Sequence, residues 1–216
     1  MQASGIISIP EAEGFYPIIS FQNGTITENS RAPSKNIGDP LVSFLTGLAG
    51  NGFIVVIPDY LGFGASEELL HPYHHRNSND AIVIDLIKAT DEFLAGGAEK
   101  AKSNNSLFLM GYSQGGWASM SVFETIENSN VLPYNLAAVS CGAGAYDLYG
   151  FTEYITQLED FAAPYYLPYF IYSHISNGLL AGNVEKYFNE PFASRLPDLF
   201  NGNNSGSVIN SQLTKK

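Results

Sequence analysis

A serine between two glycines is the residue of this sequence best suited to covalent chemistry. Ser113 lies at the centre of Gly111-Tyr112-Ser113-Gln114-Gly115 and directly follows a short apolar run. A serine hydroxyl is a weak nucleophile unless rigid backbone aims it at a base, with amide N–H groups placed for the developing oxyanion. A sharp turn from a strand into a helix supplies that geometry. The pattern therefore predicts Ser113 as a nucleophile, and the alternative is a Gly-Ser turn without chemistry.

The neighbours of Ser113 fit such a turn. Gly111 and Gly115 carry no Cβ atom that would crowd a strained backbone, and Tyr112 lies between strand and nucleophile. The N–H groups at the start of a helix favour negative charge. We therefore expect the N–H of Gln114 to donate to the oxyanion, with Gly111, Tyr112 and Gly115 supporting the turn.

A second loop is a candidate for the other oxyanion donor. Gln22-Asn23-Gly24-Thr25 follows the apolar run 18–21, and hydrolases with a Gly-x-Ser-x-Gly turn place a donating loop after an early strand. We expect the N–H of Thr25 to be that donor, with Asn23 and Gly24 shaping the loop. The alternative is a plain Asn-Gly turn.

Two other segments contain residue types that bind cofactors or metals in other proteins. Residues 59–66 are glycine-rich, but the full Gly-x-Gly-x-x-Gly spacing is missing and no helix pattern begins at these glycines. His71, His74 and His75 would need a fourth ligand to hold a metal, and we identify none. We interpret these histidines as polar residues at the start of a helix, and we expect neither a cofactor nor a metal.

Alternating strands and helices would have to position these residues. Apolar runs without polar alternation are typical of parallel strands that are covered on both faces, and apolar residues at helical spacing separate them. This rhythm predicts an α/β fold with a mainly parallel sheet flanked by helices. The expected strands are 53–57, 107–110 and 136–140, and the expected helices are 40–48 (capped by Asp39), 78–94 (capped by Ser78 or Asn79) and 115–127.

The two ends of the chain have different patterns. Apolar residues in 5–9 and 16–21 flank a turn at 10–14, which predicts an N-terminal hairpin. After residue 149 no β-branched run appears, and the segment is rich in tyrosine, phenylalanine and proline. We therefore divide the chain into a hydrolase-type core, residues 1–148, and a helical, aromatic lid or cap, residues 149–216.

Four segments together resemble a known family. They read PIISFQNGT at 17–25, PDYLGFG at 58–64, HPY at 71–73 and GYSQGG at 111–116. These segments resemble the secretory lipase group of the α/β-hydrolase superfamily, which includes fungal and bacterial lipases, and the likeness extends through most of the chain. Many members carry His-Gly where this chain has Asn23-Gly24, a change that alters the hydrogen bonding of the oxyanion loop. The resemblance implies the α/β-hydrolase fold and a Ser-acid-His triad.

The remaining triad members are harder to identify. The family order is serine, acid and histidine; only His174 follows Ser113 among the histidines, and Asp147 is an acid after the last apolar run. Both are triad candidates, although no strand pattern precedes His174. We expect instead that the chain is a fragment that lacks the C-terminal strands with the catalytic Asp and His. It should then be nearly inactive alone, since loss of the base costs about a million-fold in turnover.

Composition limits the partners and the location. The chain of 216 residues has 10 Lys+Arg against 21 Asp+Glu and a net charge of −11, so its surface repels a phosphate backbone and we expect no nucleic-acid partner. No apolar run is long enough for a transmembrane segment, and the first residues from Met1 do not form a signal peptide. The single cysteine, Cys141, is expected to be a buried structural thiol. Export is implied only by the resemblance.

The pattern as a whole favours hydrolysis of carboxylic esters, of small molecules or lipids, through an acyl-Ser113 intermediate. An aromatic cover over the site suits an apolar substrate. Two alternatives stay open: a serine aminopeptidase of the prolyl type, because the same turn serves amide cleavage, and a non-catalytic domain that keeps the fold without the chemistry.

Overall fold

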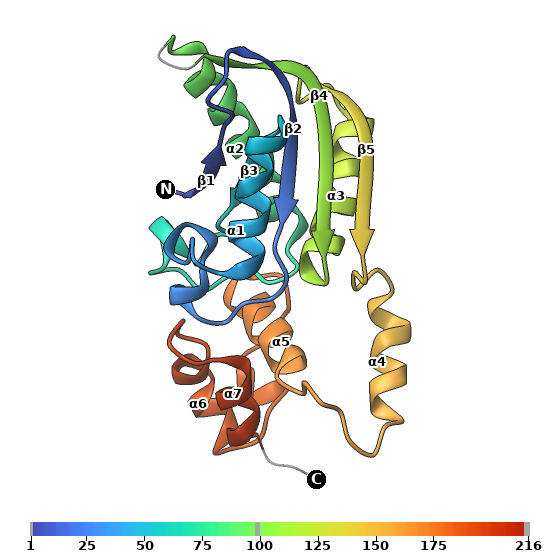
Figure 1. Cartoon of the computed structure of the whole chain (residues 1–216). Coiled ribbons are helices and arrows are strands. Elements are labelled where there is room, and N and C mark those ends of the chain that lie inside the picture. The colour runs from blue at the N-terminus through green and yellow to red at the C-terminus, as the bar shows by residue number, and fades with distance from the viewer. Residues whose placement is uncertain (1, 98–99, 214–216) are drawn as a thin grey trace.

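A five-stranded sheet forms the centre of the protein. The computed structural model describes residues 2–97 and 100–213, so Met1 of the predicted core and residues 214–216 of the predicted cap lie outside the described residues. The strand order is β1-β3-β2-β4-β5, with β1 antiparallel and the other four parallel (Figure 1). The strands are β1 (Gly5–Ser8), β2 (Gly14–Gln22), β3 (Ile54–Pro58), β4 (Ala101–Tyr112) and β5 (Asn135–Gly142).

The predicted mainly parallel α/β architecture is confirmed, and β3 shows why the sequence favours it. All five residues of β3 are buried, because strands pair with both of its edges and helices cover both of its faces. Such a strand gains its stability from apolar burial on either side, which explains its uninterrupted apolar run. Parallel neighbours then require the helical crossovers that separate the strands in the sequence.

The predicted N-terminal hairpin is wrong. Strands β1 and β2 form where expected, but β1 pairs with β3, with Gly5 opposite Pro58, and β3 lies between β1 and β2. The physical reason is that β3 is fully buried and needs partners on both edges, so β1 satisfies one edge and β2 the other. Glycine suits the first position of β1, because a Cβ on Gly5 would lie 2.7 Å from the carbonyl oxygen of Ile57.

Helix α1 (Pro40–Gly47) covers one face of the sheet, in front of the strands in Figure 1. Asp39 caps it as predicted, since its carboxylate accepts hydrogen bonds from the backbone N–H groups of Leu41 and Val42. The helix buries Leu45 against β2 and β3, whereas Leu41 is 49% and Phe44 66% exposed.

Helices α2 (Arg76–Ala95) and α3 (Gln114–Asn128) cover the other face and enclose the largest apolar core. The first of them begins at Arg76, two residues before the earlier of the predicted caps. Contacts with α3 stabilise the extra residues: Arg76 pairs with Glu124 at 2.7 Å, and Asp80 accepts a 2.6 Å hydrogen bond from Ser121. The preference of single residues for the start of a helix does not indicate these contacts with α3, so the earlier start of α2 could not be predicted.

After β5 the described chain contains helices and loops up to residue 213. Helices α5, α6 and α7 pack around a second apolar core that includes Tyr73, whereas α4 stands apart from them in Figure 1 and buries none of its residues fully. The helices are α4 (Leu148–Thr156), α5 (Tyr166–Ser176), α6 (Phe192–Leu199) and α7 (Gly206–Gln212). Short 3₁₀ turns occur at Asn29–Arg31, Pro33–Lys35, Leu48–Asn51, Gly64–Ser66 and Val184–Lys186.

Cys141 is not fully buried, which corrects the expectation of an enclosed thiol. It is a free cysteine of intermediate exposure, because β5 is the last strand of the sheet and each of its residues keeps some contact with solvent. Partial burial raises the pKa of its thiol. Within the described part of the chain, no helix has the length and apolar character needed to cross a membrane.

Candidate active site

The backbone at Ser113 adopts a conformation that side-chain-bearing residues rarely adopt. Ser113 joins β4 to α3 with φ 58° and ψ −121°. Its N–H donates to the carbonyl of Gly142 at 2.8 Å, and its own carbonyl accepts from Trp117 N–H at 3.2 Å. Strained residues of this kind persist only where their surroundings hold them. The end of β5 and the first turn of α3 hold Ser113 in this way.

The glycines on either side of Ser113 are required by close backbone contacts. A Cβ on Gly115 would lie 1.8 Å from the carbonyl oxygen of Gln22, and a Cβ on Gly111 would lie 2.1 Å from the carbonyl oxygen of Gly115. Three backbone segments, the ends of β2 and β4 and the start of α3, therefore meet without intervening side chains. Tyr112 lies next to this junction with its side chain 63% exposed.

The loop after β2 lies directly beside Ser113. A Cβ on Gly24 would lie 3.7 Å from the Cβ of Ser113. The buried Gln22 side chain fixes the base of this loop, since its amide donates to Ser20 at 2.8 Å and its carbonyl oxygen accepts from Ser119 of α3 at 2.6 Å.

Side-chain contacts hold the rest of this loop. The hydroxyl of Tyr60 donates to the backbone carbonyl of Asn23 at 2.8 Å, and the Asn23 amide donates to the carbonyl of Gly24 at 3.0 Å. The Thr25 hydroxyl is 3.0 Å from the hydroxyl of Tyr73. In residues 2–97 and 100–213, neither Thr25 N–H nor Gln114 N–H donates to a protein acceptor. Both predicted donors therefore remain available to a ligand.

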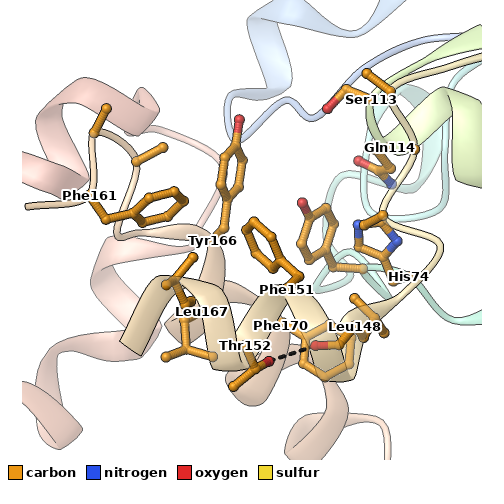
Figure 2. Close-up of a pocket in the computed structure, with 17 residues that line it drawn as sticks. His74, Ser113, Gln114, Leu148, Phe151, Thr152, Phe161, Tyr166, Leu167 and Phe170 are labelled. Atoms are coloured by element: carbon orange, nitrogen blue, oxygen red, sulfur yellow. Dashed lines mark hydrogen bonds between the residues drawn. The ribbon is translucent and has the colours of Figure 1, made fainter. Parts of the chain in front are cut away.

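A pocket of about 400 Å³ opens at Ser113. In Figure 2 the Ser113 hydroxyl points into this space, with Gln114 and His74 on the same side and aromatic rings of α4 and α5 opposite. The wall is mostly apolar, so the site combines one hydroxyl and nearby amide N–H groups with an apolar chamber. The other labelled residues in the wall are Leu148, Phe151, Thr152, Phe161, Tyr166, Leu167 and Phe170.

His71 is a buried residue behind the site, so its interpretation as a polar residue at a helix start is wrong. It is 5% exposed and stacks on Tyr60 with 5.6 Å between ring centroids. Its Nδ1 lies 2.6 Å from the carbonyl oxygen of Leu61, and its Nε2 lies 2.8 Å from Nε2 of Gln114. Burial lowers the pKa of His71 to about 4, so the ring is neutral at pH 7.

The interpretation of His74 as a polar residue at a helix start is also wrong, because His74 lines the same pocket as Ser113. Its backbone has φ 53°, and its ring packs edge-on against Trp117 with 4.7 Å between centroids. Burial, together with the nearby imidazole of His71, lowers the pKa of His74 to about 3. The aromatic residues around both histidines are the only sequence signal of their burial. Across residues 2–97 and 100–213, no group of three or more His, Cys, Asp or Glu residues is arranged to hold a metal ion.

The structure does not bring either triad candidate into hydrogen-bond contact with Ser113. Asp147 caps α4, where its carboxylate accepts from Gly150 N–H at 2.9 Å. His174 lies in the last turn of α5, with its ring centroid 3.9 Å from that of Phe170, and burial lowers its pKa. Among residues 2–97 and 100–213, no imidazole is hydrogen-bonded to the Ser113 hydroxyl.

Comparisons with known proteins place this geometry in context. The model of the prolyl oligopeptidase family matches residues 42–161, more than half of the chain and including the Ser113 turn. No curated protein sequence matches.

Among solved structures, a presumed hydrolase from Legionella pneumophila is 29% identical, with a TM-score of 0.87 over 99% of this chain. The rice cell wall degrading esterase LipA from Xanthomonas oryzae is 27% identical, with a TM-score of 0.83 over 98% of this chain. The chain spans 57% of the length of each. Candida antarctica lipase A shares the fold, with a TM-score of 0.65 over 99% of this chain and 50% of its own, at 15% identity.

Proposed function

The chain belongs to the prolyl oligopeptidase family of α/β-hydrolases, and from this premise we propose that it is a serine hydrolase that cleaves carboxylic esters. The observation that carries the proposal is the position of Ser113: a strained serine between β4 and α3, with its hydroxyl directed into an apolar pocket (Figure 2). The esterase LipA among the similar structures supports esters as the substrate class.

In the proposed reaction, the Ser113 hydroxyl attacks the ester carbonyl carbon while a base takes its proton. The N–H groups of Gln114 and Thr25 donate to the oxyanion of the tetrahedral intermediate, where each donor contributes about a hundred- to a thousand-fold in turnover. Collapse of the intermediate breaks the C–O bond, and the alcohol leaves with the proton. Water then attacks the acyl-Ser113 ester and releases the acid.

We assign the acyl group to the pocket between α4 and α5. Its volume of about 400 Å³ and its aromatic wall suit a hydrocarbon chain better than a polar group. Residues 149–216 then act as a lid or cap over the site. Leu167 lines the pocket, and the larger side chain in Leu167→Trp would fill part of its volume. We therefore expect hydrolysis of long-chain nitrophenyl esters to fall more than hydrolysis of the acetate. An equal loss for both esters would contradict this assignment.

The catalytic acid and base are the incomplete part of the proposal. No described imidazole bonds to the Ser113 hydroxyl, and the similar structures are longer than this chain. We propose that a longer form of the protein supplies both groups on further strands, and that the 216-residue chain alone turns over esters slowly. Efficient hydrolysis by the purified chain would contradict this part.

Labelling with a fluorophosphonate tests the nucleophile. At pH 9, where hydroxide assists removal of the serine proton, Ser113 should be modified faster than any other serine, as measured by mass spectrometry of peptides. Ser113→Ala should abolish the fast adduct, whereas Ser129→Ala, an exposed serine at the end of α3, should leave it unchanged. Equal modification of all serines would refute the proposal and favour a non-catalytic domain.

The family match favours one competing activity, cleavage of peptide amides after proline. The turn at Ser113 and its oxyanion donors serve amides as well as esters. Nitrophenyl esters and prolyl amides, compared on the longest available form of the protein, separate the two activities. We expect kcat/KM to be larger for the esters, and the reverse order would favour the peptidase.

A further inference from the structure

A second, much smaller cavity lies next to the pocket, behind Gln114. Its volume is about 10 Å³, which is close to the space that one water molecule occupies. The loop residues 60–61, 71–72 and 74 enclose it, together with the first turns of α2 and with Gln114 and Trp117 of α3. His74 and Gln114 line both spaces, so this cavity adjoins the proposed active site.

Three residues around this cavity carry a buried polar atom that has no protein partner. These atoms are Nδ1 of His74, Oδ1 of Asn79 and Oε1 of Gln114. Asn79 is 7% and Gln114 3% exposed. A buried polar atom without a hydrogen bond destabilises the fold, so three such atoms around one small space favour the binding of a small polar molecule there.

The neighbouring hydrogen bonds fix the orientation of both amides. The Asn79 amide nitrogen donates to Asp80 Oδ1 at 3.1 Å and to the carbonyl of Ala118 at 3.3 Å, so it is the oxygen of Asn79 that remains free.

The orientation of Gln114 follows from His71. The Leu61 carbonyl can only accept, so the His71 Nδ1 at 2.6 Å carries the proton and donates to it. The Nε2 of His71 is therefore an acceptor and receives the Gln114 amide nitrogen at 2.8 Å. The free atom of Gln114 is thus its oxygen.

We propose that one water molecule is bound in this cavity by Gln114, Asn79 and His74. The two amide oxygens are acceptors, and a water molecule has two hydrogens to donate to them. One lone pair of the water then accepts from His74, which requires the proton of this neutral imidazole to be on Nδ1. All three of these unpartnered atoms are satisfied by this single molecule, and three hydrogen bonds are the usual number for a buried water.

The bound water has a consequence for Gln114. His71 holds the amide nitrogen of its side chain and the water holds the oxygen, so the side chain is fixed at both atoms. The backbone N–H of the same residue is our proposed oxyanion donor. We infer that His71 and the water are positioning elements for this N–H; this part rests on the proposed function, whereas the binding of water does not.

A high-resolution crystal structure of the wild-type chain tests the water. We expect one ordered peak about 2.7–3.2 Å from Gln114 Oε1, Asn79 Oδ1 and His74 Nδ1. A dry cavity, or a rotated side chain that fills it, would overturn the proposal without bearing on Ser113. Failure of Ser113 to react with a fluorophosphonate, with the water in place, would overturn the proposed function alone.

Substitutions at His74 test the positioning role. His74→Phe removes the donor, and we expect loss of the water peak and a fall of about tenfold in the rate of fluorophosphonate labelling, the effect of one lost hydrogen bond. His74→Asn keeps a donor near the position of Nδ1 and tolerates the positive φ, so the rate should be restored. His75→Phe is the matched control outside the cavity. An unchanged rate in a folded His74→Phe would overturn the positioning role.

Discussion

Gly115 is the position at which one added methyl group should have the largest effect on this protein. In Gly115→Ala the new Cβ would begin 1.8 Å from the Gln22 carbonyl oxygen, and the two must separate by about 1.6 Å to reach an ordinary contact of 3.4 Å. The oxygen belongs to the backbone at the end of β2, and the Cβ is bonded directly to the backbone at the start of α3, so no flexible side chain can move to relieve the contact. Overpacking of a tight core costs about 1–3 kcal/mol, and we expect a loss of about 3 kcal/mol, a large part of a typical 5–15 kcal/mol.

Urea unfolding measures this loss, with the fluorescence of Trp117, the only tryptophan, as the probe beside the site. We expect the urea concentration at the midpoint of unfolding to fall by about 1–1.5 M, if the free energy of unfolding decreases by about 2–3 kcal/mol per molar urea. The same shift separates the Gln114 and Thr25 N–H groups, and a displacement of about 1 Å costs about a hundredfold in rate, so fluorophosphonate labelling of Ser113 should fall at least as far.

Gly47→Ala is the matched control, because nothing lies within 4 Å of its added Cβ. At the end of α1 it should raise stability by about 0.5–1 kcal/mol, the usual gain for this exchange in a helix. A Gly115→Ala protein with wild-type stability and labelling would refute the reasoning that backbone contact at the Ser113 turn holds the oxyanion donors in place.

Three further substitutions test the buried His71 ring, a buried hydrogen bond of Ser173 and the backbone strain at Ser113. Burial lowers the pKa of His71 to about 4 from about 6.5 in the unfolded chain, so between these values only the unfolded chain binds the extra proton. This group alone should therefore remove about 3 kcal/mol of stability as the pH falls from 6.5 to 4. In His71→Gln the urea midpoint should depend less steeply on pH over this range, and an unchanged dependence would argue against a neutral buried ring. The buried Ser173 accepts from Tyr73 N–H at 2.8 Å and donates to the His71 carbonyl at 2.7 Å, so Ser173→Ala should cost about 2 kcal/mol in the same assay, compared with almost nothing for the exposed Ser211→Ala. Ser113→Gly should relieve the strained backbone and stabilise the protein by about 1 kcal/mol net of glycine entropy, while it removes the reactive hydroxyl; a loss of stability would mean that the turn carries no strain.

The parallel sheet could be predicted from the sequence, because a strand that is buried on both faces appears as a short uninterrupted run of apolar residues. Strand β3 and the second half of β4 appear as apolar runs, and glycines mark the Ser113 turn. The first half of β4 was not predicted, because its residues are mostly polar although Ala101, Lys102 and Ser103 pair with β2. Pairing partners have no such local pattern. The segment 5–9 is equally compatible with β2 and with β3, and the choice depends on β3, some fifty residues away, which needs a partner on both edges.

The histidines show the same limit at the site. Nothing in the sequence around His71 indicates that it contacts Gln114, because the contact joins a loop to a helix start 43 residues later. Polar character suggested exposure, yet aromatic rings enclose His71, and its two ring nitrogens are satisfied by a carbonyl and an amide. A buried polar residue is recognisable only from its partners, and those partners become neighbours only in the folded chain.

The position of β5 affects how this chain behaves in solution. It is the last strand of the sheet, and among residues 2–97 and 100–213 no strand pairs with its outer edge. The N–H and C=O groups along that edge form a template for a strand from another molecule, and its side chains, mostly small, offer little steric obstacle. We expect self-association of the isolated chain to rise with concentration. The reactivity of the monomer should therefore be measured at concentrations below those at which this open edge pairs with another chain.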